Sequence, residues 1–399
     1  MSILTRHPWV RWGGPVAALG VVAALSVAGS IGASADPTLP PRTPAELVAD
    51  LAQARVSGLS GTVVQSADFG LPQLGLPAKS GGGSADLGSI ATGTHTWKVW
   101  YGGQDKQRVA LLGSGGESDL VHNGPDLWVW SSADRSATHY TVPAKAALPT
   151  SVSDLATDLS GAVATAIPRS PQELAERFLA FVDPSTEVAS GGTATVAGRA
   201  AYQLVFTPRD RESLVASVRL AVDAETKVPL RVQVMSRQLT TPAIEVGFTS
   251  VDFATPEARM FSFDPPPDTK VTEGGTPGMH SPAESAPTAP ATPSPTTGAG
   301  IAPRIVGSGW GAVAVGTLGS LPLPGLPSST AGSTPTPTGG SGSGDLATRL
   351  LASLPRVSGS WGSGRVFAGT LFTVVLADDG RVAVGAVGVD RVTAALAAR

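Results

Sequence analysis

The sequence contains no cysteine among its 399 residues. Disulfide bonds, thiol catalysis and zinc sites with cysteine ligands are therefore excluded, as is attachment of a lipid to an N-terminal cysteine. An ordinary hydrophobic core must supply the stability, and hydrophobic residues make up 42% of the chain, which is enough for one.

Charge is also scarce, since charged residues are 15% of the chain and the formal net charge is −3. A nucleic-acid-binding protein needs a basic surface to contact phosphates, so we expect no nucleic-acid partner. Aromatic residues are only 5% of the chain, yet eight of them are tryptophan. The 48 glycines and 34 prolines predict that much of the chain is irregular.

Motifs that carry catalysis are missing. The sequence has no Gly-x-Ser-x-Gly, no phosphate-binding loop ending in Gly-Lys and no His-Glu-x-x-His. His95, His122 and His139 lie on separate strand-like runs without carboxylates at a recurring spacing, and His280 lies in a proline-rich stretch. We interpret the first three as edge or half-buried strand residues, and we expect no metal site, no cofactor and no enzymatic activity.

The N-terminus, residues 1–35, predicts export. Arg6 and Arg11 precede an uncharged stretch from Pro15 to Ala35, which ends in the small-x-small sequence Ala33-Ser34-Ala35. A cleaved signal peptide fits this pattern, and so does a retained anchor, because the stretch approaches the length of a membrane span. Both arginines precede the stretch, so the rest of the chain is expected outside the cytoplasmic membrane.

Composition divides the remaining chain into a body at 36–273, a linker at 274–300 rich in Pro, Thr and Ser, and a C-terminal segment at 301–399. A second low-complexity run interrupts that segment at about 320–344. Within the segment, Asp378-Asp379-Gly380 lacks the other ligands of a calcium loop and predicts a hairpin turn between two strands. The C-terminal segment is therefore expected to be small and β-rich.

Three stretches of the body predict helices, each with one apolar stripe. Thr43-Pro44-Ala45-Glu46 forms a capping box with proline at the first helical position, and Ser170-Pro171-Gln172-Glu173 repeats this pattern. A weaker helix is expected around 152–163, where apolar residues recur at helical spacing.

Strands dominate the rest of the body. Apolar and polar residues alternate at 95–101, 202–206, 218–222, 230–234 and 244–248, and turn residues such as Gly102-Gly103 and Asn123-Gly124 separate strand-like runs. Short connections make neighbouring strands antiparallel. The fold class is therefore expected to be mainly β (α+β), with a large antiparallel sheet that is polar on one face and apolar on the other.

The apolar face of this sheet provides the candidate site. By alternation it carries Trp97, Val99, Tyr101, Leu204, Phe206, Leu220, Val232 and Phe248. Such a face must be covered, and helices over a curved sheet would either enclose a cavity for an apolar ligand or pack into a solid core. Trp128 and Trp130 share one face of their strand, opposite Leu127 and Val129, and would line a pocket or pack under a helix.

In their order along residues 36–273, these segments resemble the LolA-like lipoprotein-carrier superfamily. The resemblance rests on LSGTVVQ at 59–65, FGLPQLGLP at 69–77, GTHTWKVWYGGQDKQRVALL at 93–112, DLVHNGPDLWVW at 119–130, VAGRAAYQLVFTPRD at 196–210, LAVDAETKVPLRVQVM at 220–235, and the closing VGFTSVDF and FSFDPPPDTKV. These are strand-level signatures and not a catalytic motif. The chain lacks the lipid-bearing cysteine of some relatives and has a C-terminal segment that a minimal carrier lacks.

The resemblance implies an unclosed, curved half-barrel with helices covering its mouth, which binds acyl chains, lipid or lipoprotein through apolar side chains. Relatives of RseB type imply an alternative, a regulatory module outside the cytoplasm that acts on a membrane-bound anti-sigma factor or another envelope protein. We therefore expect an exported apolar-ligand carrier or, alternatively, such a regulator. An enzyme remains the least favoured class.

Overall fold

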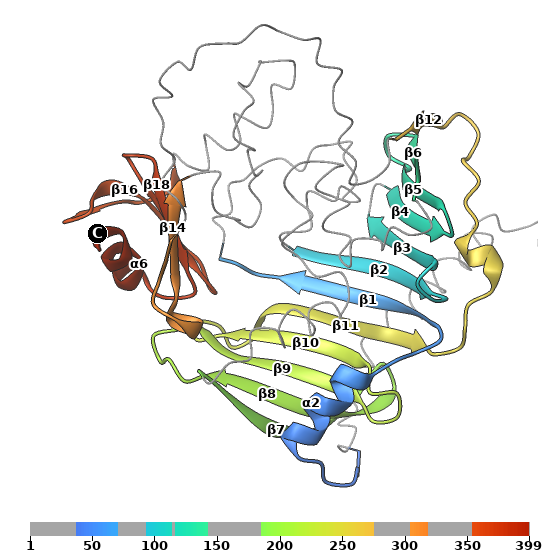
Figure 1. Ribbon diagram of the computed structural model, residues 1–399, viewed down its shortest axis with the longest axis horizontal. Coiled ribbons are helices and arrows are strands. Elements are labelled where there is room, and N and C mark those ends of the chain that lie inside the picture. The colour runs from blue at the N-terminus through green and yellow to red at the C-terminus, as the bar shows by residue number, and fades with distance from the viewer. Residues whose placement is uncertain are drawn as a thin grey trace, which may run out of the picture. The chain divides into compact units, whose positions relative to one another are not determined.

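The computed structural model in Figure 1 describes residues 37–70, 93–113, 116–142, 185–274, 304–317 and 353–398. The chain divides into two compact units, Met1–Thr38 and Leu39–Arg399, and the elements described below belong to the second. The N-terminal export signal, the helices expected at 152–163 and from Ser170, and the low-complexity run at 320–344 lie outside the described residues, as does the linker after Gly274.

Helix α2 (Pro44–Gln53) begins as the capping box predicts. The hydroxyl of Thr43 accepts a hydrogen bond from the Glu46 N–H at 3.3 Å, and the Glu46 carboxylate accepts one from the Thr43 N–H at 2.8 Å. Two N–H groups that have no partner within the helix are thereby satisfied. The apolar stripe of α2 packs on the large sheet through Leu47 and Leu51.

Twelve strands form the large sheet, and its order is β12-β6-β5-β4-β3-β2-β1-β11-β10-β9-β8-β7. The strands are β1 (Leu59–Ala67), β2 (Gly93–Tyr101), β3 (Lys106–Gly113), β4 (Gly116–Asn123), β5 (Asp126–Ser131), β6 (Ser136–Thr141), β7 (Thr186–Val196), β8 (Arg199–Pro208), β9 (Val215–Asp223), β10 (Pro229–Ser236), β11 (Pro242–Asp252) and β12 (Lys270–Glu273). The end strands β12 and β7 do not pair with each other, so the sheet is not closed. Every run in which alternation predicted a strand lies in one.

The expectation of a purely antiparallel large sheet is wrong, because the sheet is mixed. Strand β12 pairs in parallel with β6, with Lys270 opposite Ser136 and Glu273 opposite His139. A short connection forces neighbouring strands to be antiparallel, but β12 does not directly follow β6, because β7 to β11 lie between them in the chain. The chain reaches this edge from β11 through the 3₁₀ helix η3 (Ala258–Phe261), so β12 can enter in either direction.

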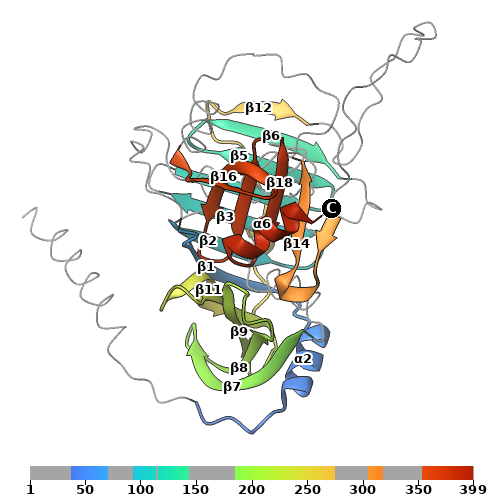
Figure 2. The ribbon, with the colours of Figure 1, turned by 90° about the vertical axis from the view of Figure 1, so that its left-hand side faces the viewer.

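The C-terminal residues form a second, six-stranded antiparallel sheet, which Figure 2 shows with helix α6 (Val389–Ala397) across it. Its order is β13-β14-β18-β17-β16-β15, with β13 (Arg304–Val306), β14 (Val313–Thr317), β15 (Arg356–Gly359), β16 (Gly362–Ala368), β17 (Thr373–Ala377) and β18 (Arg381–Gly385). The turn at Asp378-Asp379-Gly380 joins β17 to β18, as predicted. Helix α6 was not predicted. Neither described α-helix combines the length and apolarity that a membrane-spanning helix requires.

The two sheets are joined at Thr370, in the loop between β16 and β17. Its N–H donates to the Phe69 carbonyl at 3.1 Å and its hydroxyl to the Asp68 carbonyl at 2.7 Å, while its carbonyl accepts from the Ser236 hydroxyl at 2.6 Å. The adjacent Leu371 is buried in the same cluster as the apolar stripe of α2. The six-stranded sheet is therefore anchored to the body by backbone hydrogen bonds as well as by apolar contact.

A second set of contacts between the sheets is polar. Trp310, in the 3₁₀ helix η4 (Gly309–Gly311), donates from Nε1 to the Thr186 hydroxyl at 2.8 Å. Arg391 of α6 forms ion pairs with Asp210, at 3.1 Å, and with Glu212 in the β8–β9 loop. These contacts hold η4 and α6 against the first residues of β7 and the β8–β9 loop.

Candidate functional site

The eight side chains expected on the apolar side of the sheet lie on one face of it. Residues opposite one another in a β-ladder share a face. Val63 is opposite both Trp97 and Phe248, and Val246 is opposite both Gln65 and Val232. Val232 is in turn opposite Leu220, which is opposite Leu204, and Val218 is opposite Phe206. In β2, Val99 and Tyr101 follow Trp97 at every second position and therefore share its face. We call this surface the apolar face.

The apolar face is packed at its β7–β9 end. Leu204, Phe206, Leu220 and Val232 are at most 1% exposed. They form one buried cluster together with Leu47 and Leu51 of α2, and α2 packs against β7 and β8. Tyr202 belongs to the same cluster and fixes the segment before α2 by donating from its hydroxyl to the Pro40 carbonyl at 3.0 Å. At this end of the apolar face the side chains are packed against α2.

Towards β3 the apolar face holds a second buried cluster around Trp97, which is 1% exposed. Phe248 and Val99 are buried in this cluster, and Tyr101 packs against it while remaining partly exposed. Gln65 differs from the apolar side chains around it because it is polar. Its fully buried amide oxygen accepts a hydrogen bond from the Trp97 Nε1 at 3.2 Å. A buried hydrogen-bonding group fixes the orientation of an indole ring more strictly than apolar contact alone.

Trp128 and Trp130 lie on the opposite face of the sheet. Trp128 is opposite Val121 in β4, and Val121 is opposite Arg108 in β3, whereas the apolar face carries Leu127 and Val129. Both indole rings pack against Phe263, with ring centroids 5.3 and 6.1 Å away. Among the described residues, the segment that follows β11 therefore packs on these two tryptophans, and the sheet separates them from the other site candidates.

Beside Trp130 lies a buried carboxyl group, that of Asp119, which is opposite it in the β4–β5 ladder. Asp119 pairs with the Arg108 guanidinium, and its side chain is 1% exposed. Burial raises the pKa of Asp119 to about 6, against the opposing effect of Arg108. The described residues include no group of three or more carboxylates or histidines that could hold a metal ion.

His139 of β6 lies between two carboxylates at the β12 edge of the large sheet. Its Nε2 is 2.9 Å from Asp126 Oδ1 in β5, and its Nδ1 is 3.0 Å from Glu273 Oε2 in β12. Burial alone would lower the pKa of His139, but the hydrogen bonds to Asp126 and Glu273 raise it above its ordinary value. Carboxylates only accept hydrogen bonds, so only the protonated ring can donate to both. The His139 ring also stacks on the Trp128 ring, with centroids 4.4 Å apart. His139 therefore connects strands β5, β6 and β12.

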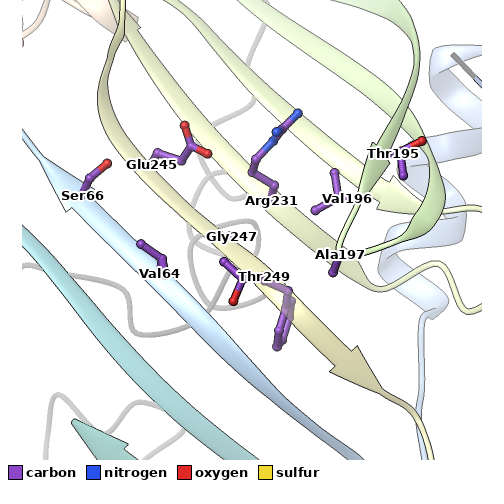
Figure 3. Close-up of a pocket in the computed structure, with 10 residues that line it drawn as sticks. Val64, Ser66, Thr195, Val196, Ala197, Arg231, Glu245, Gly247 and Thr249 are labelled. Carbon is purple, nitrogen blue, oxygen red and sulfur yellow. The ribbon is translucent and has the colours of Figure 1, made fainter. Parts of the chain in front are cut away.

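A pocket of about 330 Å³ opens on the face opposite the apolar face, and Figure 3 shows the residues that line it. They are Val64 and Ser66 of β1, Arg231 of β10, Glu245, Gly247, Phe248 and Thr249 of β11, and Thr195, Val196 and Ala197 at the tip of the β7–β8 hairpin. Of the ten residues predicted to bind an apolar ligand, only Phe248 lines this pocket. The alternation in the sequences of β10 and β11 predicts that Arg231 and Glu245 lie on the polar face. It does not predict that they line a pocket.

The β7–β8 hairpin bends over the sheet to form one wall of this pocket. Its tip contacts β11, although three strands lie between β7 and β11 in the order of the sheet. A bulge at Gly191–Gly192 interrupts β7, and bulges bend strands. The turn places Ala197 at φ 52° and Gly198 at φ 76°, which is the two-residue turn with positive φ at both central positions.

A buried ion pair fixes the β8 side of the hairpin. Arg199 donates from Nε and Nη2 to the two carboxylate oxygens of Asp223, at 2.6 and 3.0 Å. The Asp223 carboxylate also accepts from the Thr226 N–H at 2.8 Å. Burial would raise the pKa of Asp223, but the hydrogen bonds from Arg199 and Thr226 lower it overall. The carboxylate is therefore ionised at neutral pH and holds β8 to the β9–β10 turn.

No protein-family model and no curated protein sequence matches the chain. Its structure is similar to solved structures of MucB and of the LolA superfamily. The Pseudomonas aeruginosa MucA/MucB complex has a chain with 16% identity, and the match covers 88% of this chain and 96% of that one at a TM-score of 0.39. A LolA superfamily protein from Nitrosomonas europaea has 12% identity over 56% of this chain and 99% of its own, at a TM-score of 0.22. An uncharacterized conserved protein from Thermus thermophilus has 10% identity over 58% of this chain and 98% of its own, at a TM-score of 0.30.

Proposed function

We propose that the protein is an exported, non-enzymatic binder of apolar ligands such as acyl chains or lipid, and that the ligand lies against the apolar face. One observation carries the proposal. The apolar face, in which Gln65 is a buried polar member, extends from Leu111 in β3 to Phe206 in β8, through the seven strands β3, β2, β1, β11, β10, β9 and β8 of an open sheet. An apolar surface of this extent is rarely left exposed in a soluble protein.

The end of the apolar face around β2 is the better candidate for ligand contact. At the other end α2 already fills the space above Leu204 and Phe206. Around β2, by contrast, Tyr101 is partly exposed, and Val99 of β2 and Phe248 of β11 are less completely buried than Leu204. Arg6, Arg11 and the uncharged stretch behind them support a location outside the cytoplasm.

Consecutive aromatic residues of β2 supply a matched test, since Tyr101 belongs to the apolar face and Trp100 to the opposite face. Tyr101 is opposite Leu59, whereas Trp100 is opposite Ser60 and lies under the Arg108 guanidinium at 5.3 Å. Tyr101→Ala should weaken the binding of a dansyl-labelled fatty acid about tenfold, because a buried aromatic contact contributes roughly 1.5–3 kcal/mol. Trp100→Ala should leave that affinity within about twofold of the parent.

Fluorescence titration of the full-length protein measures both affinities, and guanidinium unfolding of both variants checks that they are folded. Absence of saturable fatty-acid binding by the parent protein, or equal effects of the two substitutions, would contradict the proposal.

A regulatory module that binds an envelope protein is the second candidate. The six-stranded sheet favours it, because a carrier needs no second sheet and this one is joined to the body by Thr370, Trp310 and Arg391. A neighbouring gene for a sigma factor and its membrane-bound anti-sigma partner would identify the protein to test. Calorimetric titration with the extracytoplasmic part of that partner should then give saturable binding, and Tyr101→Ala should leave it unchanged.

A further inference from the structure

Within the part of the chain that the structure describes, the pocket on the opposite face contains a cation without a counter-ion. Among the described residues, Arg231 has neither an ion pair nor a hydrogen-bond partner, although it lines the pocket and is half-buried. Its neighbour Glu245 does not neutralise it, because the Glu245 carboxylate accepts a hydrogen bond from Gln233 Nε2 at 2.9 Å instead. Figure 3 shows Arg231 and Glu245 on the same side of the sheet, on neighbouring strands.

Gly247 provides the room in which the Arg231 side chain lies. It is opposite Arg231 in the β10–β11 ladder, and a methyl group at position 247 would come within 3.0 Å of Arg231 Cγ. Gly247 is not among the glycines with positive φ, so its backbone conformation does not require glycine. A glycine within a strand that is needed for space and not for conformation indicates a close approach of neighbouring groups.

The remaining walls combine hydroxyl groups with apolar side chains. The Ser66 and Thr195 hydroxyls have no hydrogen-bond partner among the described residues, while Val64 and Val196 supply apolar surface. A volume of about 330 Å³ lies at the lower end of the range for small-molecule sites. The pocket therefore offers a planar cation, free hydroxyl groups and a short apolar wall to one small ligand.

We infer that this pocket binds a small monocarboxylate with a short apolar chain, whose carboxylate pairs with Arg231. A guanidinium matches the two oxygens of a carboxylate, and such charged hydrogen bonds are stronger than neutral ones. The Glu245 carboxylate lines the same pocket, so a ligand with two negative charges is disfavoured relative to one with a single charge. The site is on the opposite side of the sheet from the apolar face, and it stands independently of the proposed function.

Hexanoate, hexanamide and hexyl phosphate test the charge preference, because each contains six carbon atoms and they differ mainly in the charge of the head group. Saturation-transfer NMR titration of the full-length protein should give hexanoate an affinity about tenfold higher than that of uncharged hexanamide, and higher than that of hexyl phosphate. Arg231→Gln should remove the preference for hexanoate over hexanamide. The matched control is Arg219→Gln, which removes an exposed arginine from the same face of β9 and should retain the preference.

The inference fails if hexanoate and hexanamide bind equally to the parent protein, or if neither binds saturably. It also fails if Arg231→Gln retains the preference or if hexyl phosphate binds most tightly. Binding of all three chains to the apolar face would be insensitive to Arg231→Gln, so that result is distinguished from occupation of the pocket.

Discussion

Trp97 and Gln65 form a hydrogen bond within the apolar face, from the indole Nε1 to the amide oxygen at 3.2 Å, between strands β2 and β1. Both side chains are at most 1% exposed. A buried donor that loses its only acceptor costs about 1–3 kcal/mol, whereas removal of both partners costs less. This pair is therefore expected to be energetically coupled.

Gln65→Leu should accordingly destabilise the protein by about 1–3 kcal/mol, because the Trp97 N–H loses its acceptor. Adding Trp97→Phe to Gln65→Leu should cost less than Trp97→Phe costs in the parent protein. Guanidinium unfolding of the four proteins gives a coupling free energy, expected to be at least about 0.5 kcal/mol. Strictly additive effects would show that the hydrogen bond does not contribute to stability.

The ion pair between Arg199 and Asp223 predicts a larger effect. Arg199→Ala leaves the carboxylate of Asp223, whose side chain is 1% exposed, without its bidentate partner. Loss of one partner from a buried pair costs about 3–5 kcal/mol. Arg219→Ala removes an exposed arginine from β9 and should change the free energy of unfolding by no more than about 0.5 kcal/mol. Similar losses in the two variants would mean that the pair is not effectively buried.

The raised pKa of His139 predicts that the stability of the β12 edge depends on pH. Its folded-state pKa is raised, so its stabilising contribution is complete below the unfolded-state value of about 6.5 and is lost as the pH rises through the folded-state pKa. Glu273 connects this effect to β12, where the Gly274 N–H donates to the His139 carbonyl at 2.7 Å. Hydrogen exchange at Gly274, corrected for its intrinsic pH dependence, should be slower at pH 6 than at pH 8.

His139→Gln should abolish this difference in corrected exchange. The control is His122→Gln, since burial lowers the pKa of His122 and, among the described residues, its ring bonds only to the Gly124 carbonyl in the adjacent turn. An unchanged pH dependence in His139→Gln would assign the effect to another group.

The burial of Leu371 predicts that the two sheets unfold cooperatively. It is 6% exposed in a cluster that includes side chains of α2 and of the large sheet. Leu371→Asp places an unpaired charge in that cluster and should separate the unfolding of the six-stranded sheet from that of the body. Calorimetry should then show two transitions in place of one. Ile305→Asp alters a residue that is 74% exposed on β13 and should retain the single transition.

The sequence alone determined the features that depend on near neighbours in the chain. The capping box of Thr43 and Glu46 starts α2 because both partners lie within one turn. Asn123-Gly124 and Asp378-Asp379-Gly380 join adjacent strands because glycine adopts the positive φ that such turns need. Alternation in β2, β8 and β11 separated apolar from polar side chains, because successive strand residues point to opposite faces.

Only the tertiary structure decided how the faces of different strands combine. In β5 both faces carry large apolar residues, so the pattern could not assign Trp128 and Trp130 to either face of the sheet. Their face is set by the register with β4, where Trp128 lies opposite Val121, and by Phe263, which comes from a segment far along the chain.

The tertiary structure also decided the parallel pairing of the edge strand β12 and the position of the pocket. Strand β12 pairs with β6, although five strands separate the two in the sequence, and its direction depends on where the chain arrives. Arg231 and Val196 line the same pocket because a bulge at Gly191–Gly192 bends the β7–β8 hairpin over β10 and β11. A local pattern records which residues are polar, but contacts between residues distant in sequence arise from strand order and curvature, which the whole sheet determines.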